Sequence, residues 1–79
     1  MILKPISSSF TISDTPSTID EAKLVRIVAT TDALVIVYNN GTFQMLAGSV
    51  EIVEKEPTDT ISTSSSAEVI KCTAVAYKG

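Results

Sequence analysis

The sequence predicts an all-β protein, a small antiparallel β-sandwich or barrel of about six to seven short strands. Residues 34–38 (Leu-Val-Ile-Val-Tyr) form an uninterrupted apolar run, and residues 42–46 (Thr-Phe-Gln-Met-Leu) follow it after Asn39, Asn40 and Gly41. This pattern is typical of a β-hairpin, because asparagine and glycine tolerate the positive φ of tight turns. Other β-branched runs recur between turn residues, and they show no helical period.

The strand-like segments are each bounded by glycine, proline, asparagine, aspartate or serine. In chain order they are residues 2–6, 10–13, 23–29, 33–38, 42–46, 49–56 and 68–77. Pro5 restricts the first segment to an edge or to the start of a strand, because proline cannot donate a ladder hydrogen bond. We therefore expect residues 1–9 to form an N-terminal arm and residues 10–79 to form a single β-domain.

Side-chain alternation predicts which residues face the core. Phe10 and Ile12 are expected inward, and Phe43 and Met45 share a face. In residues 49–56 the pattern predicts Val50 and Ile52 inward, with Glu51 and Lys55 in solvent. One face of the closing strand carries small or buried residue types, namely Ile70, Cys72, Ala74 and Ala76.

The connections have turn chemistry. Residues 30–32 predict a tight turn that makes a hairpin of residues 23–29 and 33–38. Residues 14–20 predict a turn, with a single helical turn near residues 17–22 as the alternative. Residues 60–67 are rich in serine and predict a mobile loop.

The chain is short for a stable isolated domain. It has 79 residues, one cysteine and no histidine. An intrachain disulfide is therefore impossible, and the commonest transition-metal ligand is missing. Small domains without such supports are often stabilised by oligomerisation. Because residues 34–38 are apolar on both faces, we expect another copy of the chain or a larger partner to cover the second face.

Charge and hydropathy argue against two classes of partner. The net charge is −3 and the pI is about 4.6, without the basic patch of a nucleic-acid-binding protein. The sequence shows neither an apolar run long enough for a transmembrane helix nor the pattern of a signal peptide. We expect synthesis in a cytoplasm and no nucleic-acid or membrane partner.

Two groups of carboxylates are candidates for chemistry. Glu51, Glu54, Glu56 and Asp59 suggest a calcium site, but their spacing does not match an EF-hand loop, so a solvated strand face is the favoured interpretation. Asp14, Asp20 and Glu21 suggest a glycosidase pair, but they suit turn and capping positions in a chain with little room for a cleft.

The remaining candidates also favour structural roles. Cys72 has no histidine to activate it as a nucleophile and fits a core position. Asn40-Gly41-Thr42 matches the N-glycosylation pattern but is also a preferred hairpin turn. We predict neither an enzyme nor a cofactor, and no catalytic or metal-binding residue.

Assembly surfaces are the functional features that the pattern favours. An apolar strand left open on a soluble monomer is prone to aggregate. A short apolar arm is suited to strand addition to a neighbour's sheet, with packing of the arm against its own domain as the alternative. The residues predicted to make the subunit contacts are Ile2, Leu3, Ile6, Leu34, Ile36, Tyr38, Val75 and Tyr77.

Several segments together resemble small virion-associated proteins of tailed bacteriophages, especially phages of marine bacteria and cyanobacteria. The segments are residues 34–41 (LVIVYNNG), residues 50–61 (VEIVEKEPTDTI), a serine/alanine spacer and residues 72–77 (CTAVAY). The resemblance covers roughly two-thirds of the chain and consists of strand and turn patterns. It implies a compact β-domain that assembles on a phage head or tail.

These observations predict a non-enzymatic structural component of a phage virion, either a capsid decoration or a protein of the head, tail or fibre. It is expected to form homo-oligomers and to bind other virion proteins of the capsid or tail. The alternative is a monomeric β-sandwich module that binds carbohydrate or peptide. Sugar-binding platforms use exposed aromatic rings, and the chain has two tyrosines and no tryptophan.

Overall fold

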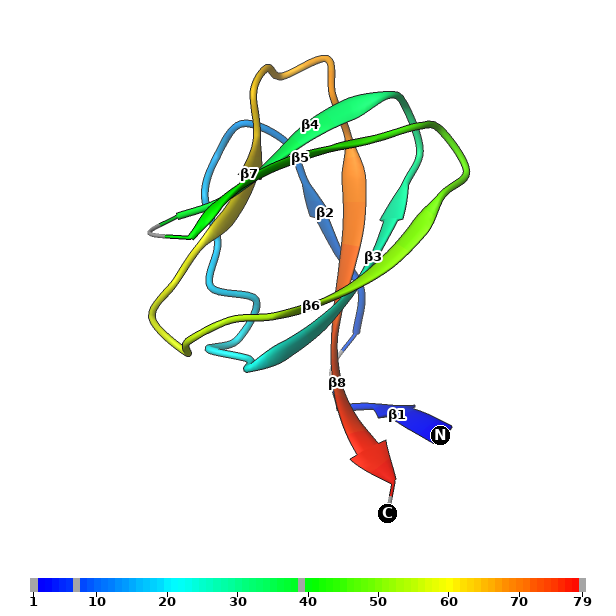
Figure 1. The fold of residues 1–79 in the computed structure, drawn as a ribbon, viewed down its shortest axis with the longest axis vertical. Coiled ribbons are helices and arrows are strands. Elements are labelled where there is room, and N and C mark those ends of the chain that lie inside the picture. Colours follow the sequence, from blue (N-terminus) through cyan, green and yellow to red (C-terminus); the bar gives the residue numbers. More distant parts are fainter. Residues whose placement is uncertain (1, 7, 39, 79) are drawn as a thin grey trace.

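The computed structural model describes residues 2–6, 8–38 and 40–78, including all of their side chains except those of Ile2, Leu3, Tyr77 and Lys78. The described residues form eight strands, which are labelled in Figure 1. They are β1 (Ile2–Pro5), β2 (Phe10–Ile12), β3 (Leu24–Ala29), β4 (Ala33–Val37), β5 (Gly41–Met45), β6 (Val50–Glu54), β7 (Ile61–Thr63) and β8 (Ile70–Lys78).

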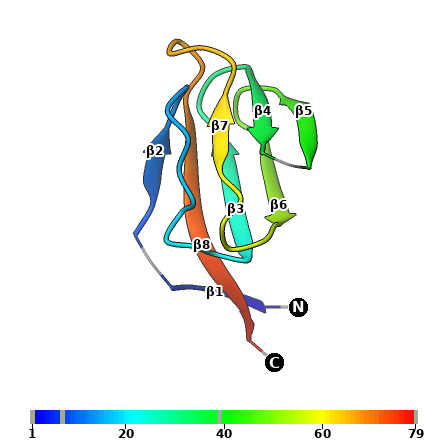
Figure 2. The same cartoon turned by 90° about the vertical axis from the view of Figure 1, so that its left-hand side faces the viewer.

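The strands form two antiparallel sheets. The larger sheet has the order β1-β8-β3-β6, with β2 also pairing with β8, and the smaller sheet has the order β5-β4-β7. Strand β8 is the longest and carries β1, β2 and β3 on its two edges. Figure 2 shows that β1 and the end of β8 extend beyond the rest of the molecule. The predicted all-β fold, a small sandwich or barrel, is confirmed.

The core lies between the two sheets. Its largest fully buried side chains come from β3, β4, β7, β8 and the loop after β2. They are Ile19, Val25, Ile27, Val35, Ile61, Ile70 and Cys72. Met45 is buried, while Phe10, Phe43 and Val53 are partly buried against this cluster. The predicted core position of Cys72 is confirmed, and Ile70 and Ala74 on the same face of β8 are also buried, whereas Ala76 is half-buried.

Strand β4 is covered unequally on its two faces. Ala33, Val35 and Val37 are buried, while Leu34 and Ile36 are half-buried. The hairpin predicted from residues 34–46 is confirmed, because β4 and β5 pair from Ala33 opposite Met45 to Val37 opposite Gly41. In the turn, Asn40 N donates to Val37 O at 3.0 Å.

Two predicted connections are wrong. Strands β3 and β4 do not form a hairpin, because β3 is bonded on its two edges to β6 and β8, while β4 pairs with β5 and β7 in the other sheet. Residues 60–67 are not simply a serine-rich loop, since Ile61–Thr63 form β7, whose three residues are all buried. Ile61 anchors this strand in the core, and its partner in β4 is Val37.

The facing predicted for this segment is wrong for Val50, Ile52 and Lys55, whereas the predicted exposure of Glu51 is confirmed. Val50 and Ile52 are 47% and 45% exposed, whereas Lys55 just after the strand is 5% exposed. The register decides this, because Val53 lies opposite Val25 and Glu51 lies opposite Ile27, and both β3 residues are fully buried. Directly opposite residues project to the same face of a sheet. Glu51 and Val53 therefore face inward from β6, and Val50 and Ile52 face outward.

A left-handed turn occupies residues 19–21, so the predicted turn is present and the helical alternative is wrong. Ile19, Asp20 and Glu21 have φ of 53°, 57° and 56°. Ile19 is fully buried, and its N–H donates to Ser17 Oγ at 3.1 Å. The N–H of Glu21 donates to Thr18 Oγ1 at 3.2 Å. Insertion of Ile19 into the core and these two local bonds offset the steric cost of a left-handed backbone.

Candidate strand-binding groove

The two sheets are joined by hydrogen bonds along one side. The segment after β2 runs beside β7, with Thr63 N donating to Ser13 O at 2.8 Å. Further along, Ser17 and Ile61 exchange backbone bonds of 3.1 and 2.8 Å. These contacts close one side of the sandwich in the manner of a barrel.

The opposite side, between β5 and β6, is open. Within the described residues β6 pairs with β3 alone and β5 pairs with β4 alone, although β5 and β6 follow one another in the chain. Each therefore presents an edge that no described strand occupies. We call the space between these edges the β5–β6 groove.

Alternate residues of β6 direct their backbone N–H and C=O groups toward this groove. Lys55 N donates to Lys23 O at 2.8 Å and Ala29 N donates to Ser49 O at 3.0 Å, so the odd-numbered residues of this strand bond to β3. In an antiparallel pair the intervening residues direct their N–H and C=O groups to the other edge. Val50, Ile52 and Glu54 therefore present unpaired backbone groups to the groove.

The same reasoning applies to β5. Tyr38 N donates to Thr60 O at 2.9 Å, which assigns the even-numbered residues of β4 to pairing with β7 and the odd-numbered ones to β5. Their partners on β5 are Met45, Phe43 and Gly41. Thr42 and Gln44 consequently direct their backbone groups away from β4, toward the groove.

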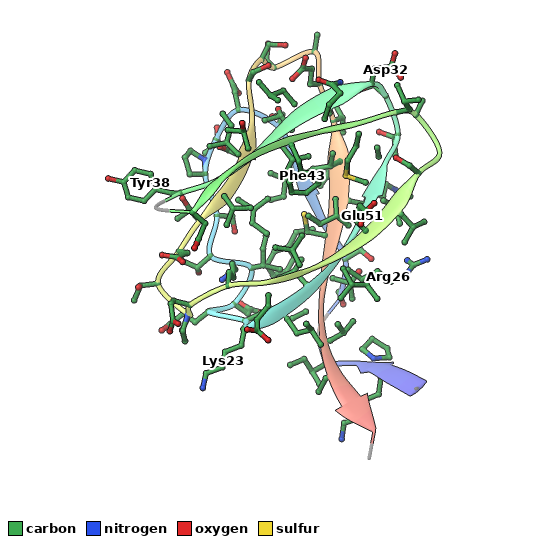
Figure 3. All side chains as sticks on the ribbon, in the orientation of Figure 1. Lys23, Arg26, Asp32, Tyr38, Phe43 and Glu51 are labelled. Atoms are coloured by element: carbon green, nitrogen blue, oxygen red, sulfur yellow. The ribbon has the colours of Figure 1, made fainter. Side chains whose placement is uncertain are left out.

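The groove has a volume of about 430 Å³ and a partly apolar floor. Phe43 and Val53, which also pack against the core, line it together with Ile52. Asn40, Gly41 and Thr42 form the rim on the β5 side. Figure 3 shows the side chains of Phe43 and Glu51 between the ribbons of β5 and β6.

Two carboxylates make the groove acidic. Glu51 and Glu54 line it, and in the described part of the chain neither carboxylate makes a hydrogen bond or an ion pair. No lysine or arginine is among the lining residues. An extended segment with both apolar and basic side chains would complement this surface.

The predicted acidic cluster divides into two parts. Asp59 is 6% exposed and accepts hydrogen bonds from Asn40 Nδ2 and from Glu56 N, so it has a structural role. Glu51, Glu54 and Glu56 are exposed. Among the described residues, no group of three or more histidine, cysteine, aspartate or glutamate side chains is arranged to hold a metal ion.

The other candidates for chemistry lie apart from the groove. Cys72 is fully buried on β8, and burial raises the pKa of its thiol to about 12. Asp14, Asp20 and Glu21 are exposed in the connection between β2 and β3. Asn40 lies in the turn before β5.

A second groove, of about 680 Å³, lies at the base of the β1–β8 ribbon, the paired strands Ile2–Pro5 and residues 75–78. It is lined by Ile6, the left-handed turn and residues that follow β6. Here Lys55 Nζ donates to Ala22 O at 2.6 Å, and burial lowers the pKa of this amine. The Lys55 amine is therefore occupied by a hydrogen bond within the fold.

The residues predicted for assembly fall in two separate places. Leu34 and Ile36 lie on the outer face of β4. Tyr38 directly follows this strand, is 62% exposed and points away from the molecule in Figure 3. Ile6 is 59% exposed near the ribbon, while Val75 is 5% exposed and buried within the chain. Ile2, Leu3 and Tyr77 were also predicted for assembly, but their side chains are not among those that the structure describes.

Sequence reasoning missed the open edges of β5 and β6. It assigned the apolar residues Val50 and Ile52 to the core, because alternation alone does not distinguish the inner face of a strand from its outer face. The usable signal was the acidic neighbour Glu54, since charged residues on a strand are a common feature of sheet edges.

No protein family, curated protein or solved structure matches this chain. In the described part of the chain there is also no helix with the length and hydropathy needed to cross a membrane.

Proposed function

We propose that this protein is a non-enzymatic assembly module that accepts an extended strand from another polypeptide in the β5–β6 groove, and that it acts as a structural component of a tailed-phage particle. One observation carries the first part of this proposal. The sandwich is hydrogen-bonded along its β2–β7 side and open along its β5–β6 side. A strand added to the β6 edge would occupy this open side.

The physical basis is β-strand addition. An extended peptide gains affinity from main-chain hydrogen bonds with an exposed sheet edge and gains specificity from alternate side chains. Here β6 offers the backbone groups of Val50, Ile52 and Glu54, and Phe43 and Val53 offer an apolar floor. The unpaired carboxylates Glu51 and Glu54 favour a basic strand.

The role in a particle rests on the resemblance of residues 34–41 and 50–61 to virion-associated proteins, together with the strand-accepting edge. Assembly by main-chain pairing is suited to a structural component, because it requires no reactive group. Mass spectrometry of purified particles tests this role, and we expect peptides of the protein at a fixed ratio to the major capsid protein. Absence from washed particles would contradict it.

The carbohydrate-binding alternative has less support. Among the described side chains, that of Tyr38 is the only aromatic one that is strongly exposed. A stacking platform for sugars requires exposed aromatic faces. Peptide binding, in contrast, uses the same edge that the proposal invokes.

A model peptide tests strand acceptance directly. The probe is an acetylated and amidated pentapeptide of alternating lysine and valine, titrated into the isotope-labelled protein and followed by amide NMR shifts. We expect saturable shifts centred on Thr42, Gln44, Val50, Ile52 and Glu54. The variant Glu51→Gln should weaken binding about two-fold, since one exposed ion pair contributes about 0.5 kcal/mol.

Edge variants supply the matched control. Ile52→Pro removes an N–H that faces the groove and leaves the β3–β6 ladder intact, so it should abolish the shifts. Thr11→Pro removes the corresponding outward N–H of β2, on the other side of the sandwich, and should leave binding unchanged. Equal binding by wild type and Ile52→Pro, both shown to be folded, would refute strand acceptance in the groove.

A further inference from the structure

We propose that the strand accepted by the β5–β6 groove is β1 of a second copy of this chain, so that copies associate head to tail. This inference rests on the proposed function and names the partner. It follows from three features of β1 and the groove. Their charges are opposite, their outward backbone groups belong to odd-numbered residues on β1 and to even-numbered residues on β6, and one register satisfies both conditions.

The charges of the two surfaces are complementary. Within the β1–β8 ribbon, residues 2–6 contain Lys4 and no aspartate or glutamate, and residues 74–76 contain no charged residue. Lys4 is exposed. The groove carries Glu51 and Glu54 without a lysine or arginine. The ribbon also extends away from the rest of the molecule, which makes β1 accessible to another copy (Figure 2).

The outer edge of β1 is free to pair. In the described sheet order β1 is the terminal strand and pairs only with β8. Ile6 N donates to Ala74 O at 2.9 Å, so the even-numbered residues of the arm bond to β8. Leu3 and Pro5 therefore direct their backbone groups outward, and proline supplies a carbonyl but no N–H.

The alternation of backbone groups along each strand restricts which residues of β1 and β6 can pair. The outward backbone groups are those of odd-numbered residues on β1 and of even-numbered residues on β6, and an antiparallel pair must place them opposite one another. In one such register Leu3 lies opposite Ile52 and Pro5 lies opposite Val50. The same register places Lys4 opposite Glu51. Shifting it by two residues in either direction places Lys4 opposite Val53 or Ser49 and loses the ion pair.

The chosen register fits the chemistry of each position. Opposite residues project to the same face, so Lys4 enters on the groove face with Glu51, and Pro5 joins the exposed apolar side chains of Val50 and Ile52 on the outer face. Two backbone bonds connect Leu3 and Ile52, and a third runs from Val50 N–H to the Pro5 carbonyl. The large sheets of successive copies would become continuous through β6 and β1.

The contact is heterologous, because a ribbon surface meets a groove surface. Such contacts close into rings or extend as filaments. Both outcomes suit a component that is repeated around a particle, and neither requires a cofactor or a reactive residue.

A charge-swap experiment tests the register. We expect wild-type protein to associate reversibly in analytical ultracentrifugation, with Glu51→Lys and Lys4→Glu each weakening association about ten-fold, since each replaces an attraction by a repulsion. Both single variants retain one intact surface. An equimolar mixture should therefore regain the association that each variant lacks, and so should the double variant.

The controls carry the same changes of charge at positions outside the contact. Asp14→Lys and Lys71→Glu alter exposed residues, Asp14 in the connection between β2 and β3 and Lys71 on β8 away from the ribbon. Neither should change the association constant beyond about two-fold. Thermal unfolding of every variant verifies that the fold is kept.

The outcomes separate this inference from the proposed function. If the lysine–valine peptide binds in the groove while wild type stays monomeric at its highest soluble concentration, strand acceptance stands and the second copy is refuted. Association that Ile52→Pro abolishes but that charge swapping neither weakens nor restores would also overturn this inference, because it would indicate β6 pairing with β6. If neither the peptide nor a second copy binds, both proposals are refuted.

Discussion

Asn40 Nδ2 donates a hydrogen bond to Asp59 Oδ2 at 2.7 Å. This bond ties the β4–β5 turn to the connection between β6 and β7. Asp59 Oδ2 also accepts from Glu56 N at 3.3 Å, and Asn40 itself lines the groove. The bond therefore holds together, at one end of the groove, the hairpin that carries β5 and the segment that follows β6.

Asp59→Ala should destabilise the protein by about 1–3 kcal/mol, because it leaves the Asn40 amide and the Glu56 N–H without their acceptor. The free energy of unfolding from urea titration measures this. Asp14→Ala removes an exposed carboxylate that makes no hydrogen bond in the described part of the chain, and it should change that free energy by less than about 0.5 kcal/mol. Equal losses from the two variants would show that the Asp59 bonds do not stabilise the fold.

Neighbouring substitutions on β6 test which face is inward. Ile52→Lys places a charge on the exposed outer face and should alter stability by less than about 1 kcal/mol, whereas Val53→Lys places it against the core and should cost more than about 3 kcal/mol. Chemical denaturation of both variants measures the contrast. The opposite order of stabilities would restore the facing predicted from the sequence.

Glycine at the left-handed turn should stabilise the protein. Asp20 and Glu21 are exposed residues with φ near 57° and 56°, where glycine meets no steric cost from a Cβ atom. We expect Asp20→Gly and Glu21→Gly each to raise the free energy of unfolding by about 0.5–1 kcal/mol. Lys23→Gly, at an exposed residue without positive φ, is the control and should lower it. Thermal melts of the three variants distinguish these results.

The buried thiol of Cys72 predicts a loss of stability at alkaline pH. Its pKa is raised from 9.0 to about 12 by burial, so above pH 9 the unfolded chain loses the proton that the folded chain keeps. Stability from this group is full below pH 9 and falls as the pH rises toward 12. A shift of this size corresponds to about 4 kcal/mol at the alkaline limit.

The variant Cys72→Ala tests whether the thiol causes the loss of stability at alkaline pH. The variant is less stable at neutral pH because a buried side chain is truncated, but its free energy of unfolding should fall less steeply with pH across this range. Urea denaturation at stepped pH values gives both slopes. Parallel slopes for wild type and variant would show that the thiol does not titrate with unfolding.

Local patterns were sufficient to predict several elements. The β4–β5 hairpin follows from an apolar run, a turn with Asn40 and Gly41, and a second strand, and each of these acts over a few residues. Strand β3 was predicted from β-branched residues alone. Cys72 was correctly assigned to the core, because small apolar residues alternate along β8.

Long-range pairing decided what those patterns could not. Residues 61–63 resemble a polar loop, yet they form β7 because β4 has a vacant edge and Ile61 has a place in the core. Val50 and Ile52 resemble core residues, yet the register with β3 turns Glu51 and Val53 inward.

The all-β class and the positions of most strands can be predicted from the sequence, because strand propensity and turn chemistry are local properties of the chain. The pairing of edges cannot be predicted in this way, since it depends on residues far apart in sequence that meet only in the folded protein. The candidate site consists of two open edges. It became visible only when β5 and β6, neighbours in the chain, were found in different sheets.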